Sequence, residues 1–291
     1  MSKKVKDFRY THAARDTLSH AKTEIKPQYE SAEAEKLALQ KAQTELSMMQ
    51  ELLYAQNEWA VLIILQGMDT SGKDGLIRHV MNGVNPQGCS VASFKKPTVH
   101  ELDHDFLWRC HREIPERGKI GVFNRSYYED IVVPMVHPEI LETSQIPPSL
   151  RQGKRFYEHR CEAIVQFEKY LARQGVLVLK IFLHISKKEQ KKRLLSRLEE
   201  PDKNWKFEEG DLIERKHWNK YQKAYSFCFQ HTSHAHGPWH ILPADNKLQA
   251  RVLASQIIIK AIAELNLKFP KVEPAKKKAI AGYRQKLLNE A

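Results

Sequence analysis

Hydrophobic and polar residues follow two different patterns along this chain. Between residues 31 and 57, leucines and methionines recur at spacings that favour one helical face, and neither glycine nor proline interrupts them. We therefore expect a long amphipathic helix there. After it come short, continuous apolar runs rich in branched side chains. These runs span residues 60–66, 90–94, 120–123, 175–185 and 239–242.

The short apolar runs have the pattern of strands that are buried on both faces. Such strands are typical of parallel sheets, because helices cover both sides of the sheet. Helical stretches separate the runs, and this alternation indicates a parallel α/β layer fold. We predict a central parallel sheet of about five strands, flanked by helices.

The composition indicates an anionic partner. The chain of 291 residues has a formal net charge of +12, which suits phosphate chains, nucleotides, nucleic acid or acidic lipid. The four cysteines are scattered without a C-x-x-C pair, which argues against a zinc site or a disulfide framework. The N-terminus lacks the apolar core of a signal peptide, and no apolar run approaches the roughly 20 residues of a membrane helix. We expect a cytoplasmic protein that is not embedded in a membrane.

The most informative segment runs from residue 61 to residue 75 and reads VLIILQGMDTSGKDG. It holds Gly67, Gly72 and Lys73 at the G-x-x-x-x-G-K spacing, after a predicted strand and before a predicted helix. In that context the spacing predicts a P-loop. Glycines let the backbone N–H groups turn inward, and the helix N-terminus and Lys73 add positive charge. The segment is therefore expected to hold phosphate groups.

The loop departs from the usual pattern in two places. Asp74 stands where a serine or threonine normally ligates magnesium, while Thr70 and Ser71 lie inside the loop. Asp69 also lies inside, and a carboxylate among phosphates is repulsive unless a cation or an arginine offsets it. Asp69 is thus a candidate Mg2+ ligand or a residue that orients the acceptor. A turn-forming aspartate is the alternative.

A second polar segment follows the strand predicted at residues 120–123. ATP-hydrolysing P-loop proteins commonly end another strand with an acidic residue that holds magnesium. Here Asn124 and Arg125 take that place. Ligands bind at the carboxyl ends of strands in open α/β sheets. Arg125 is therefore a candidate for neutralising the oxygens of a transferring phosphoryl group.

Further candidates lie in basic segments. Arg193 and Arg197 share one face of a helix predicted in KKEQKKRLLSR. This helix would begin a lid, at about residues 187–215, that closes over phosphates; a solvated charged face is the alternative. For Arg109 and Arg112, surface salt bridges are the alternative to phosphate binding. The remaining candidate binding residues are Lys95, Arg109, Arg112, Glu129, Lys203 and Lys206.

Taken together, these segments resemble the polyphosphate kinase 2 family. The stretches that carry the resemblance are GMDTSGKDG, FKKPT, DHDFLWRCHREIPERGKIGVFNRSYYED and RLLSRLEEPDKNWKF, spread over residues 57–245. The resemblance implies a thymidylate-kinase-like P-loop kinase fold with a helical lid. It implies phosphoryl transfer between inorganic polyphosphate and adenine nucleotides, with guanine nucleotides as the alternative. It also implies Mg2+, with Mn2+ as the alternative, and a homo-oligomer.

The resemblance also assigns roles by position. The family's loop aspartate and lysine match Asp69 and Lys73, and the arginine of its second motif matches Arg125. The basic residues of its lid match Arg193 and Arg197.

One position points to a subgroup within that family. Many members that prefer ADP as the acceptor have aspartate where this chain has Asn124. The asparagine form resembles the subgroup called class III, which accepts AMP as well as ADP. A neutral amide is expected to lessen the repulsion of the AMP phosphate.

We divide the chain into an N-terminal arm and helix (residues 1–57), a kinase core with its lid (58–267) and a basic tail (268–291). The expected function is reversible transfer of the terminal phosphoryl group of polyphosphate to ADP and AMP. One rival is an ATP-dependent nucleoside monophosphate kinase on the same fold. The other is a non-catalytic protein that binds nucleic acid through its positive charge. No nucleic-acid recognition module is visible in the sequence.

Overall fold

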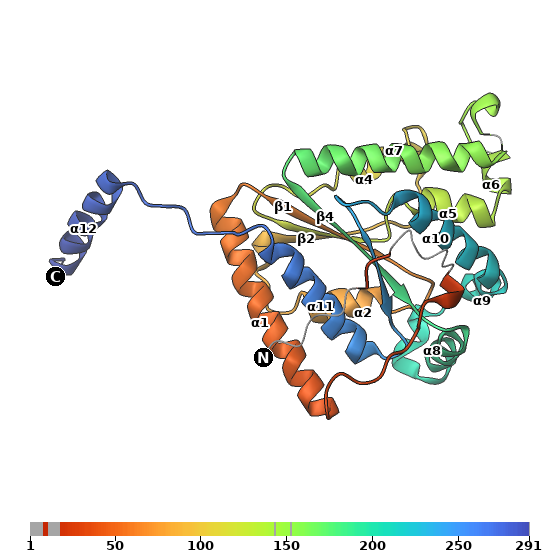
Figure 1. Ribbon diagram of the computed structural model, residues 1–291, viewed down its shortest axis with the longest axis horizontal. Coiled ribbons are helices and arrows are strands. Elements are labelled where there is room, and N and C mark those ends of the chain that lie inside the picture. The colour runs from red at the N-terminus through yellow and green to blue at the C-terminus, as the bar shows by residue number, and fades with distance from the viewer. Residues whose placement is uncertain (1–7, 11–17, 143, 152, 291) are drawn as a thin grey trace.

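The computed structural model describes residues 8–10, 18–142, 144–151 and 153–290. At its centre lies a five-stranded sheet with the order β2-β3-β1-β4-β5 (Figure 1). Every neighbouring pair of strands in this sheet is parallel. The prediction of a parallel sheet of about five strands is confirmed. The strands are β1 (Ala60–Gln66), β2 (Cys89–Ser93), β3 (Ile120–Asn124), β4 (Val176–His184) and β5 (Trp239–Pro243).

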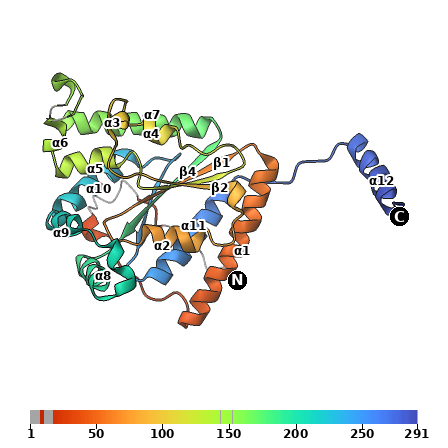
Figure 2. The ribbon, with the colours of Figure 1, turned by 180° about the vertical axis from the view of Figure 1, so that it is seen from behind.

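Helices cover both faces of the sheet (Figures 1 and 2). One layer consists of α1 (Ala32–Gln56), α2 (Lys73–Val80) and α11 (Lys247–Ala263), and the other of α5 (Glu129–Val136), α7 (Gly153–Arg173) and α10 (Trp218–Thr232). The central strand β1 is consequently buried along its whole length, as its continuous apolar sequence predicts.

Shorter helical segments connect these layers or lie beside them. They are η1 (Leu18–His20), η2 (Pro86–Gly88), α3 (Val99–Leu102), α4 (Trp108–His111), α6 (Glu139–Glu142) and η3 (Pro148–Leu150). Three more, α8 (Lys187–Glu199), η4 (Pro201–Lys206) and α9 (Glu209–Lys216), follow β4 directly in the chain. Figure 1 shows α8 beside the arrowhead of β4, at the carboxyl end of the sheet.

The long helix predicted before the first strand is confirmed as α1. Its N-cap is Ser31, whose hydroxyl oxygen accepts a hydrogen bond from the backbone N–H of Ala34 at 3.1 Å. Leu39, Leu46 and Leu53 follow one another at seven-residue intervals and are buried. This spacing keeps them on one face of the helix, which packs against α11.

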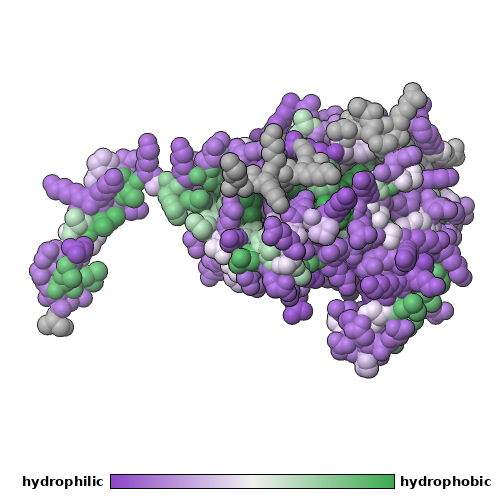
Figure 3. Space-filling view, turned by 60° about the horizontal axis from the view of Figure 1, so that its bottom comes forward, coloured by the Kyte–Doolittle hydropathy of each residue, from purple (hydrophilic) through white to green (hydrophobic). Residues whose placement is uncertain are grey.

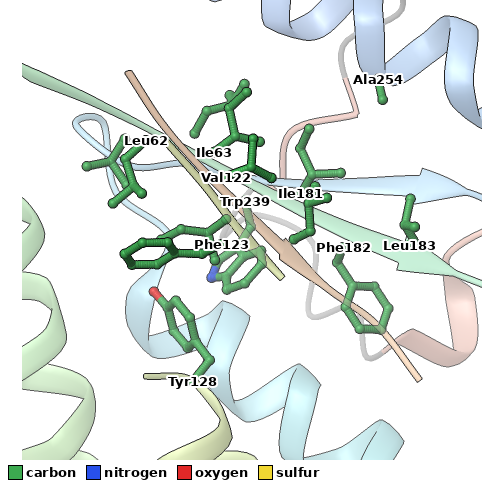
Figure 4. Packing of buried hydrophobic residues seen from close by; sticks show 14 of the residues in the cluster. Leu62, Ile63, Val122, Phe123, Tyr128, Ile181, Phe182, Leu183, Trp239 and Ala254 are labelled. Carbon is green, nitrogen blue, oxygen red and sulfur yellow. The ribbon is translucent and has the colours of Figure 1, made fainter. Parts of the chain in front are cut away.

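Side chains from four strands and the two helical layers form one hydrophobic core. Leu62 and Ile63 of β1, Ile181 and Phe182 of β4, and Trp239 of β5 all belong to this core, and Ile63 and Ile181 lie on the opposite face of the sheet from Trp239 (Figure 4). Each of these five side chains is at most 1% exposed. Burial of this apolar surface positions the carboxyl ends of the strands, where the loops that follow the strands meet.

A fully buried ion pair crosses the layer between β4 and α7. Lys180 Nζ lies 2.6 Å from Glu168 Oε2, and both side chains have no exposed surface. Glu168 Oε1 accepts hydrogen bonds from the hydroxyls of Tyr127 and Tyr128. Lys180 also donates to the carbonyl of Thr232 at 2.6 Å. The network ties together three elements of one layer, because its residues come from the segment before α5, from α7 and from α10.

The two ends of the chain differ in their contacts. Residues 8–10 lie antiparallel to β5, and the N–H of Tyr10 donates to the carbonyl of Trp239 at 2.8 Å. The rest of the predicted surface arm includes residues 1–7 and 11–17, which lie outside the described residues. At the other end, α12 (Pro274–Leu288) extends away from the body (Figures 1 and 3). Within the described ranges, no helix combines the length and apolar composition that crossing a membrane requires.

We expect Lys180→Met to destabilise the protein by about 3–5 kcal/mol, because it leaves the Glu168 carboxylate buried without its partner. Equilibrium denaturation monitored by circular dichroism would measure the loss. Adding Glu168→Gln should recover part of it. The matched control is Lys154→Met, which breaks the exposed Lys154–Glu158 pair and should change the stability far less, because exposed ion pairs contribute little. Equal losses for the two single variants would contradict the prediction.

Candidate active site

The loop between β1 and α2 has the backbone conformation of a phosphate cradle. Gly67, Thr70 and Gly72 have positive φ angles of 153°, 61° and 105°. A Cβ atom on Gly67 would lie 2.9 Å from the carbonyl oxygen of Leu183, so only glycine fits beneath the loop. The helix α2 begins directly after Gly72. The unpaired N–H groups of its first turn are therefore available to an anion.

Lys73 lies under this loop and braces it. Its Nζ atom donates a hydrogen bond to the carbonyl of Gly67 at 2.7 Å, and the residue is 8% exposed. Burial lowers the pKa of Lys73 to about 8, and the neighbouring charge of Arg125 acts in the same direction. The carboxylates of Asp69, Glu129 and Asp74 act in the opposite direction, and the ammonium group of Lys73 is still less basic than that of an ordinary lysine.

Arg125 joins the loop after β3 to the loop after β1. Its Nη2 atom lies 2.8 Å from Asp69 Oδ1. Its backbone has a φ of 65°, and its N–H donates to the carbonyl of Leu65 at 3.0 Å. Glu129, whose Oε2 lies 4.0 Å from Nη1 of Arg125, raises the pKa of that arginine further, as does Asp69. Burial raises the pKa of Glu129, so the carboxyl behind Arg125 is more basic than usual.

Asn124 contacts the residue that replaces the usual serine or threonine of the loop. Its Nδ2 atom donates to Asp74 Oδ1 at 2.7 Å. An amide suits this place because it offers a donor to the carboxylate. An aspartate at position 124 would bring two carboxylates together, and each would disfavour the ionised form of the other.

Arg193 is buried, and each of its side-chain nitrogens donates to protein acceptors. Nη1 donates to the carbonyls of Thr70 and Ser71 at 3.0 and 2.8 Å, and Nη2 donates to those of Ala244 and Asp245 at 2.6 and 3.1 Å. Nε donates to Glu189 Oε1 at 2.8 Å. The side chain thus holds α8 against the phosphate loop and against the loop after β5. Its predicted contact with a ligand phosphate stays a prediction.

The other basic residues of the predicted lid are less buried than Arg193. Arg197 Nη1 lies 2.8 Å from Asp211 Oδ2 and donates to the carbonyl of Lys206 at 2.9 Å. The Nζ atom of Lys203 donates to the hydroxyl of Ser196 at 3.1 Å. The Nζ atom of Lys206 lies 4.9 Å from the centre of the Trp205 ring. Arg197, Lys203 and Lys206 line one cleft together with the phosphate loop.

Residues of α8, η4 and the phosphate loop line an open cleft with a volume of about 1200 Å3. It lies at the carboxyl ends of the strands, where open α/β sheets bind ligands. Most of the predicted site residues meet here. They are Asp69, Thr70, Ser71, Gly72, Lys73, Asp74, Lys95, Asn124, Arg125, Arg193, Arg197, Lys203 and Lys206.

Two predicted arginines do not line this cleft. Arg109 Nη1 donates to the carbonyl of Lys95 at 2.8 Å, and Nη2 lies 3.3 Å from Asp130 Oδ2. Arg109 therefore supports the loop that presents Lys95. Arg112 is exposed and lies over the ring of Trp108. A phosphate-binding role for either arginine stays a prediction that this geometry does not support.

The sequence reasoning missed several polar residues of the cleft. Lys247 and Arg251 of α11 line it, as do Lys192 and Asp211. A signal for the first two exists in the sequence. The two residues are four positions apart, and Lys247 is the first residue of the helix that follows β5 and the capping residue Asn246. Because the carboxyl ends of parallel strands share one edge of the sheet, this helix start is expected near the cleft.

Proteins that are similar to this chain in sequence are named as polyphosphate phosphotransferases. Residues 28–270 match the family described as Polyphosphate kinase 2. An ADP-polyphosphate phosphotransferase of Rhodopseudomonas palustris is 46% identical over 288 residues, which are 99% of this chain and 100% of that protein. An AMP/ADP-polyphosphate phosphotransferase of Meiothermus ruber is 43% identical over 235 residues, with 81% and 84% of the two chains covered.

A solved structure of a polyphosphate kinase 2 has a similar fold. The crystal structure of polyphosphate kinase 2 from Arthrobacter aurescens TC1 matches with a TM-score of 0.85 and 36% identity, over 96% of this chain and 98% of that one. Sequence and fold therefore agree with the resemblance that the motifs carry, and the chain belongs to the polyphosphate kinase 2 family.

Proposed function

We propose that this chain transfers the terminal phosphoryl group of inorganic polyphosphate to ADP and AMP, in a reversible reaction. The observation that carries the proposal is the meeting of Lys73, Asp69 and Arg125 in one cleft beneath a basic lid. The names of the relatives from Rhodopseudomonas palustris and Meiothermus ruber support this substrate class.

The residues of the cleft suit a transfer that requires no strong general base. The attacking oxygen of the nucleotide's terminal phosphate is already ionised near neutral pH, because the second pKa of a phosphate is about 6. Catalysis then consists of positioning and charge neutralisation. We assign the neutralisation of the transferring group to Lys73, Arg125 and the N–H groups of the loop. Glu129 is the candidate acceptor for hydrogen bonds from the nucleotide.

Among the described residues, no three His, Cys, Asp or Glu side chains are grouped to hold a metal ion, so a divalent cation in the cleft would need phosphate oxygens as ligands beside a carboxylate. Asp69, Asp74 and Asp211 line the cleft, and the pKa of Asp211 is raised by burial and then by the charge of Asp69. A hard cation with oxygen ligands relieves such crowding of negative charge. We place Mg2+, with Mn2+ as the alternative, at Asp69. When bound, it would neutralise phosphate oxygens as metals do in other phosphoryl-transfer enzymes.

We assign the polyphosphate chain to the lid side of the cleft. Arg197, Lys203 and Lys206 face it from the lid, and Lys95 faces it from the loop after β2. Arg193 contributes by holding the phosphate loop in shape, since its donors reach the carbonyls of Thr70 and Ser71. The use of guanine nucleotides, self-association, a cytoplasmic location and the proposed division of the chain stay predictions.

The function is tested by product formation from AMP or ADP, with either polyphosphate or ATP as the donor and with Mg2+. We expect polyphosphate to convert AMP to ADP and ADP to ATP. Lys73→Ala should reduce turnover by about a hundredfold or more, because a cation that faces the transferring charge is lost. Turnover with ATP as the only effective donor would instead indicate a nucleoside monophosphate kinase. Activity of Lys73→Ala like that of the wild type would contradict the assignment of the loop.

We expect kcat/KM to fall as the pH rises through about 8, because the free enzyme then loses the Lys73 proton. The value of kcat/KM falls rather than rises with pH, because only the charged ammonium form of Lys73 neutralises phosphate. Bound phosphate favours the charged lysine, so kcat should fall at a higher pH than kcat/KM. In Lys73→Arg the guanidinium stays charged, and any residual activity should lack this falling limb. A limb that persists in Lys73→Arg would assign the titration to another group.

We expect Asn124→Asp to lower AMP phosphorylation by about tenfold or more and ADP phosphorylation by less, because it places a second carboxylate beside Asp74. Initial rates with each acceptor at saturating polyphosphate would measure the ratio. Asn124→Ala removes the same hydrogen bond without adding charge and is the matched control. Unchanged AMP activity in Asn124→Asp would refute the electrostatic explanation, and an equal loss in Asn124→Ala would assign the effect to the hydrogen bond.

A further inference from the structure

The cleft continues past the phosphate loop along the first turns of α11. Lys247 and Arg251 lie one helical turn apart and line the same cleft as Lys73. The guanidinium of Arg251 rests against the first turn of α2, because its Nη2 atom lies 3.5 Å from where a Cβ on Gly75 would be. A row of positive groups therefore leads from the helix that begins at the phosphate loop onto α11.

These two cations lack the acceptors that their neighbours have. Glu189 is paired with Arg193, and Glu200 is paired with Lys203. In the part of the chain that the structure describes, the side chains of Lys247 and Arg251 form neither a hydrogen bond nor an ion pair. Asp245 also lines the cleft, and its Oδ1 atom accepts a hydrogen bond from the N–H of Ser186 at 2.7 Å. Lys247 and Arg251 are thus open to an anion from outside the chain.

The surroundings of the pair make its positive charge unfavourable without an anion. The pKa of Lys247 is lowered by burial and then by the charges of Arg193 and Lys203. Burial also lowers the pKa of Arg251, and Arg193 and Arg78 add to this effect. A solvated charged face would not show such crowding, because its side chains separate in water. The carboxylate of Glu189 has the opposite effect on Lys247, but it already accepts from Arg193.

The size of the cleft also suits an extended ligand. Its volume of about 1200 Å3 exceeds the roughly 300–1,000 Å3 that are typical of sites for small molecules. The N-terminus of the 17-residue helix α11 adds partial positive charge at the same place as Lys247. An anion with charges repeated along its length would meet the phosphate loop and α11 in succession.

We propose that Lys247 and Arg251 form a distal subsite for inorganic polyphosphate, which holds phosphate residues beyond those at the phosphate loop. The inference rests on the proposed function and extends it to the choice of donor length. A short chain fills the phosphate loop alone, whereas a long chain also reaches α11. The subsite consequently favours long chains over short ones.

The test compares KM for tetraphosphate with KM for long-chain polyphosphate, at saturating ADP, in wild type and in Lys247→Gln/Arg251→Gln. We expect KM for the long chain to rise about tenfold in the variant, which corresponds to about 1.4 kcal/mol. KM for tetraphosphate should rise much less, so the preference for the long chain shrinks. Raising the salt concentration should also weaken long-chain binding less in the variant, because fewer charged contacts are made.

The matched control is Lys260→Gln/Lys277→Gln, which removes the same charge from the far end of α11 and from α12. It should keep the wild-type ratio of the two KM values. Unfolding midpoints of both double variants identify any loss of folded protein. An equal rise of both KM values would overturn the inference and assign the pair to the phosphate loop, and an unchanged KM for the long chain would also overturn it. Wild-type protein that turns over neither polyphosphate would overturn the proposed function itself.

Discussion

The ion pair between Asp69 and Arg125 joins the two loops on which the candidate site depends. The two residues follow β1 and β3, which are neighbours in the sheet, so the fold itself brings them to 2.8 Å. Without Arg125, Asp69 would repel phosphate from the loop that contains it. The charge of Arg125 also helps to lower the pKa of Lys73. Its Nη1 atom lies 4.0 Å from Glu129 Oε2. The balance of two cations and two carboxylates is therefore a property of the group and not of any one residue.

Features that depend on local physics were predictable from the sequence. The apolar run AVLIILQ is buried throughout because a central parallel strand has helices on both sides. Gly67 and Gly72 have the positive φ angles that the loop requires. The residues after β3 lie at the carboxyl edge of the sheet, as their position after a predicted parallel strand indicates. In each case the sequence of a short segment is sufficient to predict its local structure.

Contacts between distant segments were not predictable in this way. The spacing of Arg193 and Arg197 placed both on one helical face, but it could not tell that only Arg193 points into the protein. Its bond to the Thr70 carbonyl joins residues 123 positions apart. Arg109 was expected near phosphate and instead supports the backbone of Lys95. The spacing of Lys247 and Arg251 after a capping asparagine indicates a helix start, but the order of the strands is what brings this helix end to the cleft, because β5 pairs with β4.

The bonds of Arg193 also limit how the lid can move. One guanidinium holds the carbonyls of two separate loops, and its Nε pairs with Glu189 one turn earlier in α8. The first half of α8 is thereby tied to the phosphate loop and to the loop after β5. A movement of α8 that kept these hydrogen bonds would have to bend the chain after Arg193. The segment beyond that point carries Arg197, Lys203 and Lys206.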